Sequence, residues 1–194
     1  VLRYAAARHI TVVPEIEMPG HATAAIASYP QLGVTGKHQA VSSDWGVHTS
    51  IYNIDDRTFA FLDNVLDEVM ALFPGPYIHV GGDEAVKDQW QASRTIQRRM
   101  HALGIKDGDA LQAWFIARIG RHLAAHGRKL VGWDEILQGG VPPDAVVMSW
   151  RGVQGAIDAA KLGHDTVMSP SPTMYFDHLQ SDLPDEPTGR PDVI

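Results

Sequence analysis

Two adjacent acids follow a short apolar run that ends in two glycines. The run is YIHV at positions 77–80, the glycines are Gly81 and Gly82, and the acids are Asp83 and Glu84. Successive side chains of a regular strand point to opposite faces, so neighbouring acids would not face one pocket. Glycines permit a bulge or kink that redirects the chain. We therefore expect both carboxylates to reach one site, where one acid with a high pKa donates a proton and the other stays ionised to stabilise charge.

These acids also have a purely structural interpretation, because acidic residues cap helices and stabilise their first turn. The double glycine and the aromatic residues near other predicted strand ends favour catalysis instead. Two acids with different pKa values are the usual catalytic groups of glycoside hydrolases. Sugars also have apolar faces that stack on rings, and a sugar pocket combines several rings with a few polar groups. The candidate rings are Trp114, Trp133, Trp150 and Tyr175.

Alternating strand-like and helix-like segments would position these residues. Short apolar runs rich in β-branched residues predict strands at 9–18, 76–84, 129–136, 145–150 and 165–170. Amphipathic patterns predict helices at 58–73, 109–126 and 153–162. Asp107 or Asp109 is expected to cap the second of these helices, and Gly163 to end the third. The alternation indicates an α/β fold, either a barrel or a doubly wound sheet.

The chemistry at the strand ends favours a barrel. Acidic, basic or aromatic residues end most of the predicted strands, namely Glu15, Glu17, Asp83, Glu84, Trp133, Glu135, Trp150 and Arg151. A (β/α)8 barrel assembles its site from such ends. A doubly wound nucleotide fold concentrates its signal in one Gly-rich turn, and the sequence contains neither GxGxxG nor a P-loop.

The barrel is expected only in part, because five predicted strands stand where a barrel has eight. The link at 137–144 is too short for a full helix, and residues 1–8 resemble the last turns of a helix already under way. We therefore expect a segment of a longer protein. Two loop-like stretches, 30–56 and 170–192, are rich in Gly, Pro, Ser and Asp, and loops of that length often cover a site.

Composition excludes several classes of function. The formal charge of −7, the pI near 5.7 and the lack of a basic stripe argue against a nucleic-acid partner. The sequence has no run that approaches a membrane span, so no membrane partner is expected. It also has no cysteine, which excludes disulfides, thiolate catalysis and Cys-ligated zinc but leaves the cellular compartment open.

Five motifs occur in order along the chain: PEIEMPGH (14–21), HVGGDE (79–84), GWDEI (132–136), MSWRG (148–152) and YFD (175–177). Together they resemble the family 20 glycoside hydrolases, the β-N-acetylhexosaminidases. The resemblance implies a (β/α)8 TIM barrel, of which residues 1–194 would form a partial catalytic domain of about strands three to seven. It implies hydrolysis of terminal N-acetylhexosamine in oligosaccharides or glycoconjugates, without a metal or another cofactor.

The resemblance also implies a role for each site residue. In such enzymes the nucleophile is the 2-acetamido oxygen of the substrate, an exception to the two-carboxylate scheme. Glu84 would be the general acid and base, Asp83 would orient the acetamido N–H, and Tyr175 would hold the acetamido oxygen. The remaining assignments are pocket walls or sugar contacts for Trp114, Trp133, Trp150 and Asp177, and supporting roles for His21, Glu17 and His79.

Two departures keep other interpretations open. The family's first strand, with an arginine that grips the sugar, and its last strand, with a tryptophan and a glutamate, have no counterpart in this sequence. A non-catalytic sugar-binding or structural barrel fragment is therefore one alternative. A metal-dependent barrel hydrolase is another, given ten histidines, although HxH and HExxH are absent. The helical pair His122 and His126 is expected on an outer helix, facing solvent.

Overall fold

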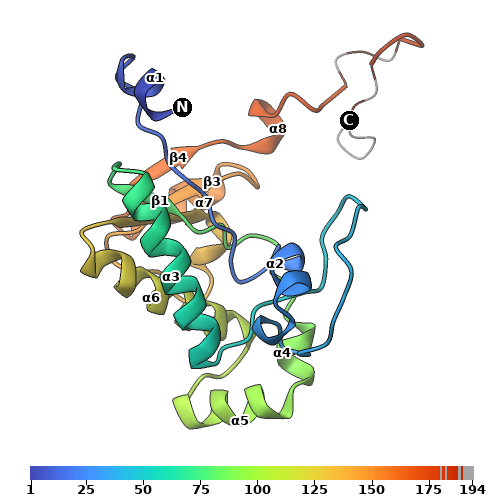
Figure 1. Cartoon of the computed structure of the whole chain (residues 1–194). Coiled ribbons are helices and arrows are strands. Elements are labelled where there is room, and N and C mark those ends of the chain that lie inside the picture. The colour runs from blue at the N-terminus through green and yellow to red at the C-terminus, as the bar shows by residue number, and fades with distance from the viewer. Residues whose placement is uncertain (180, 182, 188, 190–194) are drawn as a thin grey trace.

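Four short parallel strands form the centre of the structure, a computed structural model that describes residues 1–179, 181, 183–187 and 189 (Figure 1). They are β1 (Tyr77–His79), β2 (Lys129–Trp133), β3 (Val146–Ser149) and β4 (Thr166–Met168). Their order in the sheet is their order in the chain. A doubly wound sheet reverses its order at a switch point. The steady progression therefore supports the barrel interpretation.

Three amphipathic helices lie where the pattern predicts them: α3 (Asp56–Leu72), α6 (Gly108–Ala125) and α7 (Gln154–Lys161). Asp107 is the N-cap of α6 and accepts a hydrogen bond from the Ala110 N–H at 2.8 Å, whereas Asp109 pairs with Lys87. The chain leaves α7 through Gly163 at φ +86°, as expected for a helix end. These predictions are confirmed.

The remaining helices are short. They are α1 (Leu2–Ala6), α2 (Thr23–Ser28), α4 (Asp88–Ala92), α5 (Arg94–Leu103), α8 (Ser171–Met174) and the 3-10 helices η1 (Pro30–Leu32) and η2 (Asp134–Leu137). No α-helix forms over 137–144, as predicted. Sequence analysis did not predict α5, because only Ile96 and Met100 are buried on it and two positions make no periodic pattern. Within the described ranges, no helix is long and apolar enough to cross a membrane.

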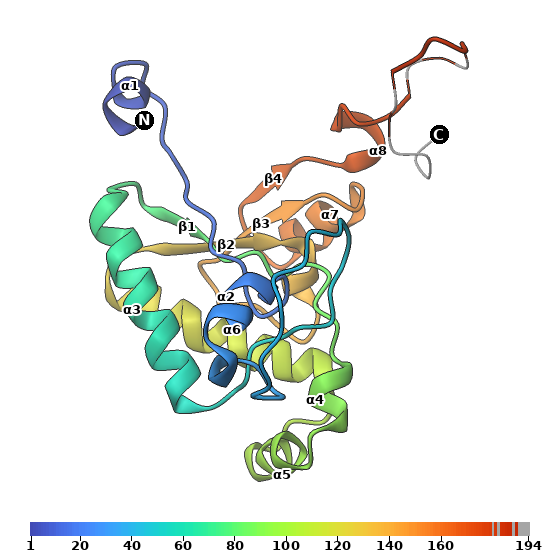
Figure 2. The same ribbon diagram turned by 45° about the vertical axis from the view of Figure 1, so that its right-hand side comes forward.

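Both predicted loops contain short helical turns. The stretch 30–56 begins with η1 and otherwise has little regular structure before α3. The stretch 170–192 contains α8, and its residues 180, 182, 188 and 190–192 lie outside the described residues. The predicted helix end at 1–8 is present as α1, which the figures show away from the sheet at the end of an extended segment (Figure 2).

The predicted strand at 9–18 is wrong in extent. Only Glu15 forms a β-bridge, with His79 of β1. Backbone hydrogen bonds still hold the segment beside β1, since His79 N–H donates to Pro14 O at 2.9 Å and Met18 N–H donates to Val80 O at 3.0 Å. Pro14 has no N–H to offer the ladder, which limits the regular pairing. The segment is thus a fifth, irregular row at the edge of the sheet.

The two faces of the sheet have different surroundings. One face packs on the helices, and its core includes Ile78, Leu130 and Val147 together with Phe59 of α3 and Phe115 of α6. Figure 2 shows α3 and α6 on this side of the sheet. Alternate residues point to the other face and line a hollow of about 710 Å³, among them Val13, Tyr77, His79, Val131, Trp133, Val146 and Met148. In a barrel, side chains along each strand alternate between the outer face, which the helices cover, and the inner face. The strands of this sheet show the same alternation.

Candidate active site

The chain turns sharply where β1 leaves the sheet. Gly81, Gly82 and Glu84 have positive φ values of +69°, +96° and +48°. A non-glycine residue in this region costs about 1–3 kcal/mol and occurs mostly at functional sites. The turn lets Asp83 and Glu84 reach one cavity, although they are adjacent in sequence.

The two glycines are required by close contacts as well as by conformation. A Cβ atom on Gly81 would lie 1.2 Å from Glu17 Oε1, and one on Gly82 would lie 2.5 Å from Ile136 Cγ2. The buried side chain of Gln112, on α6, donates a hydrogen bond to Gly82 O at 2.6 Å. The turn is therefore packed on all these sides and cannot accept larger residues without moving the acids.

His21 links the two acids. Its Nε2 atom lies 3.4 Å from Asp83 Oδ2 and 3.3 Å from Glu84 Oε2. The other carboxylate oxygen of Asp83, Oδ1, is buried and finds no hydrogen-bond partner among the residues that the structure describes. The contact with His21 is therefore on Oδ2 alone.

The helix-cap interpretation of the acids is wrong. The next helix, α4, begins at Asp88, and its N-cap residue is Lys87. No side chain makes a capping hydrogen bond there. Asp83 and Glu84 instead face the cavity beside His21.

The cavity has a volume of about 590 Å³ and combines acids with aromatic rings. Such a volume is typical of small-molecule sites. The predicted residues that line it are His21, Asp83, Glu84, Trp133, Trp150 and Tyr175, and the loop before α3 adds Asp44, Trp45, Gly46 and Val47. Six separate segments, each at or after a strand end or within a long loop, therefore meet at this one hollow.

The whole chain matches a single family model, "Glycosyl hydrolase family 20, catalytic domain", over residues 1–192. The chain belongs to this family. "Beta-hexosaminidase" of Porphyromonas gingivalis is 49% identical over 189 residues, which cover 96% of this chain and 24% of the relative. "Beta-hexosaminidase" of Vibrio furnissii is 36% identical over 196 residues, which cover 96% of this chain and 31% of the relative.

Solved structures of family 20 proteins have the same fold. The chitobiase of Flavobacterium johnsoniae superposes with a TM-score of 0.85 at 35% identity, over 91% of this chain and 28% of its own. A mutant Streptomyces plicatus beta-hexosaminidase in complex with product (GlcNAc) superposes with a TM-score of 0.80 at 31% identity, over 97% of this chain and 35% of its own. The partial TIM barrel predicted from the strand ends is thus confirmed. The chain spans about a quarter to a third of the length of these four proteins.

Glu15 positions Trp133. Sequence analysis assigned no specific role to this residue. Trp133 Nε1–H donates to Glu15 Oε1 at 2.9 Å, and His79 Nδ1 lies 3.1 Å from the same oxygen. The His79 and Trp133 rings meet edge to face at 4.9 Å. The His79 hydrogen bond is the main reason that the pKa of Glu15 lies below its usual value, against the effect of burial. His79 is buried, and its supporting role stays a prediction. The spacing of Glu15 and Glu17, two apart, was the sequence signal that both point inward.

Trp150 is held by the acid of the GWDE motif. Its Nε1–H donates to Glu135 Oε2 at 3.0 Å, and Arg151 Nε lies 3.6 Å from Glu135 Oε1 and 3.1 Å from Asp134 Oδ1. Burial raises the pKa of Glu135 to about 7, although the hydrogen bond from Trp150 opposes the rise. The two acids of this motif are thus buried supports, and the ring that they orient faces the cavity.

Two predicted contacts are not brought to the cavity. Trp114 lies on α6, packs edge to face on Phe59 at 5.6 Å and lines a different hollow with Gly139 and Pro142. Trp114 is therefore not among the residues that line the cavity beside the acids, and its assignment to the pocket wall stays a prediction. Asp177 lies two residues beyond Tyr175 and is not among the residues that line the cavity.

Glu17, next to Asp83, has the largest change in pKa among the acids around the site. Burial raises its pKa to about 9, and the nearby charges of Asp83 and Glu15 add to the rise. Glu17 is therefore neutral at pH 7. A neutral carboxyl beside Gly81 supports the turn without adding a third negative charge to the acids.

Glu17→Gln is expected to stabilise the fold at alkaline pH. Above pH 4.5 the Glu17 carboxyl of the unfolded chain loses its proton, whereas that of the folded chain keeps it up to about pH 9. The free energy of unfolding therefore falls as the pH rises from about 4.5 to about 9. At pH 7 this cost is up to about 3 kcal/mol. Urea unfolding of the variant and wild type should give similar free energies at pH 4.5 and a growing advantage for the variant up to pH 9. Glu68→Gln, at an exposed position of α3, is the control, and a pH-independent difference for Glu17→Gln would contradict the assignment.

Proposed function

We propose that the protein removes terminal, non-reducing β-linked N-acetylhexosamine, either N-acetylglucosamine or N-acetylgalactosamine, from oligosaccharides or glycoconjugates. Residues 1–194 form part of its catalytic barrel domain. The observation that carries the proposal is the convergence of Asp83 and Glu84, linked by His21, on a cavity walled by Trp133, Trp150 and Tyr175. The names of the two beta-hexosaminidase relatives and the GlcNAc product in the Streptomyces plicatus complex support it.

The first step is an attack by the acetamido oxygen of the substrate on its own anomeric carbon. Glu84 gives its proton to the leaving glycosidic oxygen as that bond breaks, and a cyclic oxazolinium ion results. Asp83 accepts the acetamido N–H and balances the positive charge of the ion. Tyr175 holds the acetamido oxygen in line for the attack.

The second step returns the enzyme to its starting state. Glu84, now a carboxylate, takes a proton from water, and the water oxygen attacks the anomeric carbon on the face that the leaving group occupied. The ring of the oxazolinium ion opens, the acetamido group is restored and the sugar is released with its β configuration retained. Trp133 and Trp150 supply the apolar walls against which the acetamido group and the sugar ring pack.

A chromogenic assay tests this function. The purified protein should release nitrophenol from nitrophenyl N-acetyl-β-glucosaminide but not from nitrophenyl β-glucoside, which lacks the acetamido nucleophile. The rate should be unchanged by a chelator, and a loss of activity in chelator would favour the metal-dependent alternative. N-acetylglucosamine that binds without any turnover would instead indicate a sugar-binding protein.

A further inference from the structure

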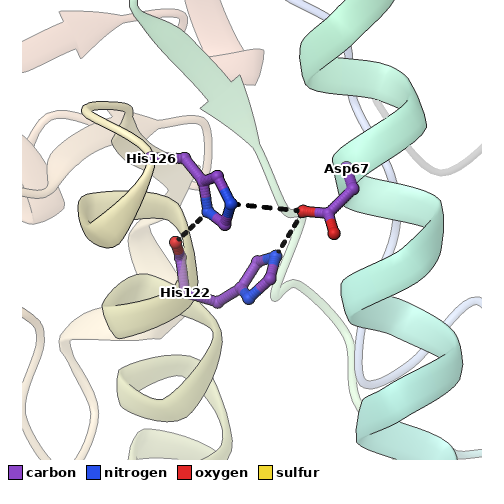
Figure 3. A group of neighbouring side chains, drawn as sticks. All are labelled: Asp67, His122 and His126. Carbon is purple, nitrogen blue, oxygen red and sulfur yellow. Dashed lines mark hydrogen bonds and ion pairs between the residues drawn. The ribbon is translucent and has the colours of Figure 1, made fainter.

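Two helices on the outer layer of the barrel face each other with pairs of metal-ligating residues. Asp63 and Asp67 lie one turn apart on α3, and His122 lies on α6 one turn before His126, the C-cap residue that follows the helix. Figure 3 shows both imidazole rings directed at the Asp67 carboxylate. The predicted outer-helix position is confirmed for His122, whereas His126 is the C-cap residue just after α6, and both converge on Asp67 and do not simply face solvent.

The three ligand atoms gather around one point. His122 Nε2 lies 2.8 Å from Asp67 Oδ1, and His126 Nε2 lies 3.8 Å from the same oxygen. One ligand atom from each of the three residues falls within 4.8 Å of the other two. Metal–nitrogen and metal–oxygen bonds are about 2.0–2.2 Å, so small side-chain rotations bring these atoms around a single cation.

The other ring nitrogens are arranged as they are in metal-binding histidines. His126 Nδ1 lies 2.9 Å from the backbone oxygen of His122. A carbonyl oxygen only accepts, so Nδ1 donates to it, and Nε2 is the ring nitrogen directed at Asp67. His122 has Asp63 Oδ1 at 3.6 Å from Nδ1, on the side of the ring opposite the shared point. The His122 carbonyl is a partner of the kind that orients a ligating imidazole, and Asp63 places a carboxylate near the His122 ring without a hydrogen bond.

We propose that Asp67, His122 and His126 form a binding site for a divalent cation of the zinc class, in which the cation joins α3 to α6. Two imidazoles and one carboxylate suit Zn²⁺, Ni²⁺ or Cu²⁺ rather than Mg²⁺, which prefers oxygen ligands alone. The side chains of Asp67 and His126 are about half exposed, at 48% and 49%, so an ion and its remaining water ligands have access from solvent. A cation that binds only the folded chain also stabilises it.

This site is separate from the catalytic acids and does not depend on the proposed hydrolase function. Its residues lie on the helical layer, whereas Asp83 and Glu84 lie where β1 ends. A second group with metal-ligand spacing, Glu17, His21 and Asp83, includes two residues that line the active-site cavity, His21 and Asp83. The experiment must therefore distinguish the two locations.

Isothermal titration calorimetry with Zn²⁺ alone, in a buffer free of chelators, is the first test. The wild-type protein should bind one equivalent through the helical site. His122→Ala and His126→Ala should each weaken binding by more than about tenfold, since loss of a supporting partner alone costs about 10- to 100-fold. Asp63→Asn should weaken it by about tenfold for the same reason. His101→Ala, an exposed histidine on α5, is the matched control and should leave binding unchanged.

His21→Ala separates the two locations. It should leave the Zn²⁺ affinity of the helical site unchanged, and loss of binding in this variant with full binding in His122→Ala would overturn the proposal. Electron paramagnetic resonance of the Cu²⁺-loaded wild type gives a readout that needs no variant. Hyperfine coupling to two imidazole nitrogens is expected, and a spectrum with fewer than two would also overturn it.

Discussion

Replacing Glu84 by Gln is expected to lower the hydrolysis of nitrophenyl N-acetyl-β-glucosaminide by about 10²- to 10⁴-fold, the usual contribution of general acid–base catalysis. Gln keeps the size of the side chain but cannot give a proton to the leaving oxygen or take one from water. The backbone of Glu84 already has φ +48°, so the substitution brings no new strain to the turn. Binding of N-acetylglucosamine should be retained, because Trp133, Trp150 and Tyr175 are unchanged.

The matched control is Glu68→Gln, which makes the same chemical change at an exposed position of α3. Its activity should equal that of wild type. Circular dichroism and the unfolding midpoint should be the same for all three proteins. Undiminished activity of Glu84→Gln would remove Glu84 from the mechanism.

Gly81→Ala is expected to damage both the fold and the site. At φ +69° any side chain is strained, at a cost of about 1–2 kcal/mol. The new Cβ would also stand 1.2 Å from Glu17 Oε1, and Glu17 is partly buried, so the carboxyl or the turn must move. A displacement of about 1 Å at the acids costs about 10²-fold in rate. We expect a loss of at least about 3 kcal/mol in unfolding free energy, a large value typical of overpacking at a special backbone position, and at least a 10²-fold loss of activity.

Gly104 provides a control that separates conformation from contact. It has the same φ of +69°, at the end of α5, but a Cβ there would meet nothing within 4 Å. Gly104→Ala should therefore lose only about 1–2 kcal/mol of stability and keep full activity. Equal effects of the two substitutions would show that the contact between Gly81 and Glu17 has no special importance.

Much of the architecture follows from local pattern. The amphipathic stripes of α3 and α6 repeat over four or more turns, and they gave the helix bounds to within two residues. The runs around β1, β2 and β3 are mostly buried and apolar, which is the composition expected of strands in a parallel sheet. Strand pairing at the edge of the sheet could not be predicted in this way. The segment at 9–18 has strand-like composition, but its proline interrupts the backbone hydrogen bonds with β1, and only one bridge forms.

The site could be predicted where the motif itself fixes the position. Four site residues lie at or shortly after strand ends, namely Asp83, Glu84, Trp133 and Trp150. The carboxyl ends of parallel strands bring such residues together. Trp114 has no such constraint, because the direction of a helical side chain depends on how the helix is rotated against the sheet. Gln112 and Trp45 were not predicted either: one reaches the turn from α6, and the other lies in an irregular loop. Only the position of that long loop before α3 indicated that something in it would cover a site.

The central claim is that Glu84 moves the proton while Asp83 directs the substrate's own nucleophile. Its most direct test is kcat/KM for Glu84→Gln and Asp83→Asn on two N-acetyl-β-glucosaminides, one with a dinitrophenyl and one with a methylumbelliferyl leaving group. Dinitrophenolate departs without a proton, so Glu84→Gln should lose little on the first substrate and about 10²- to 10⁴-fold on the second. Asp83→Asn should lose about 10²- to 10³-fold on both, as expected for lost electrostatic stabilisation of the ring-closed ion. The same leaving-group dependence in both variants would contradict this division of roles.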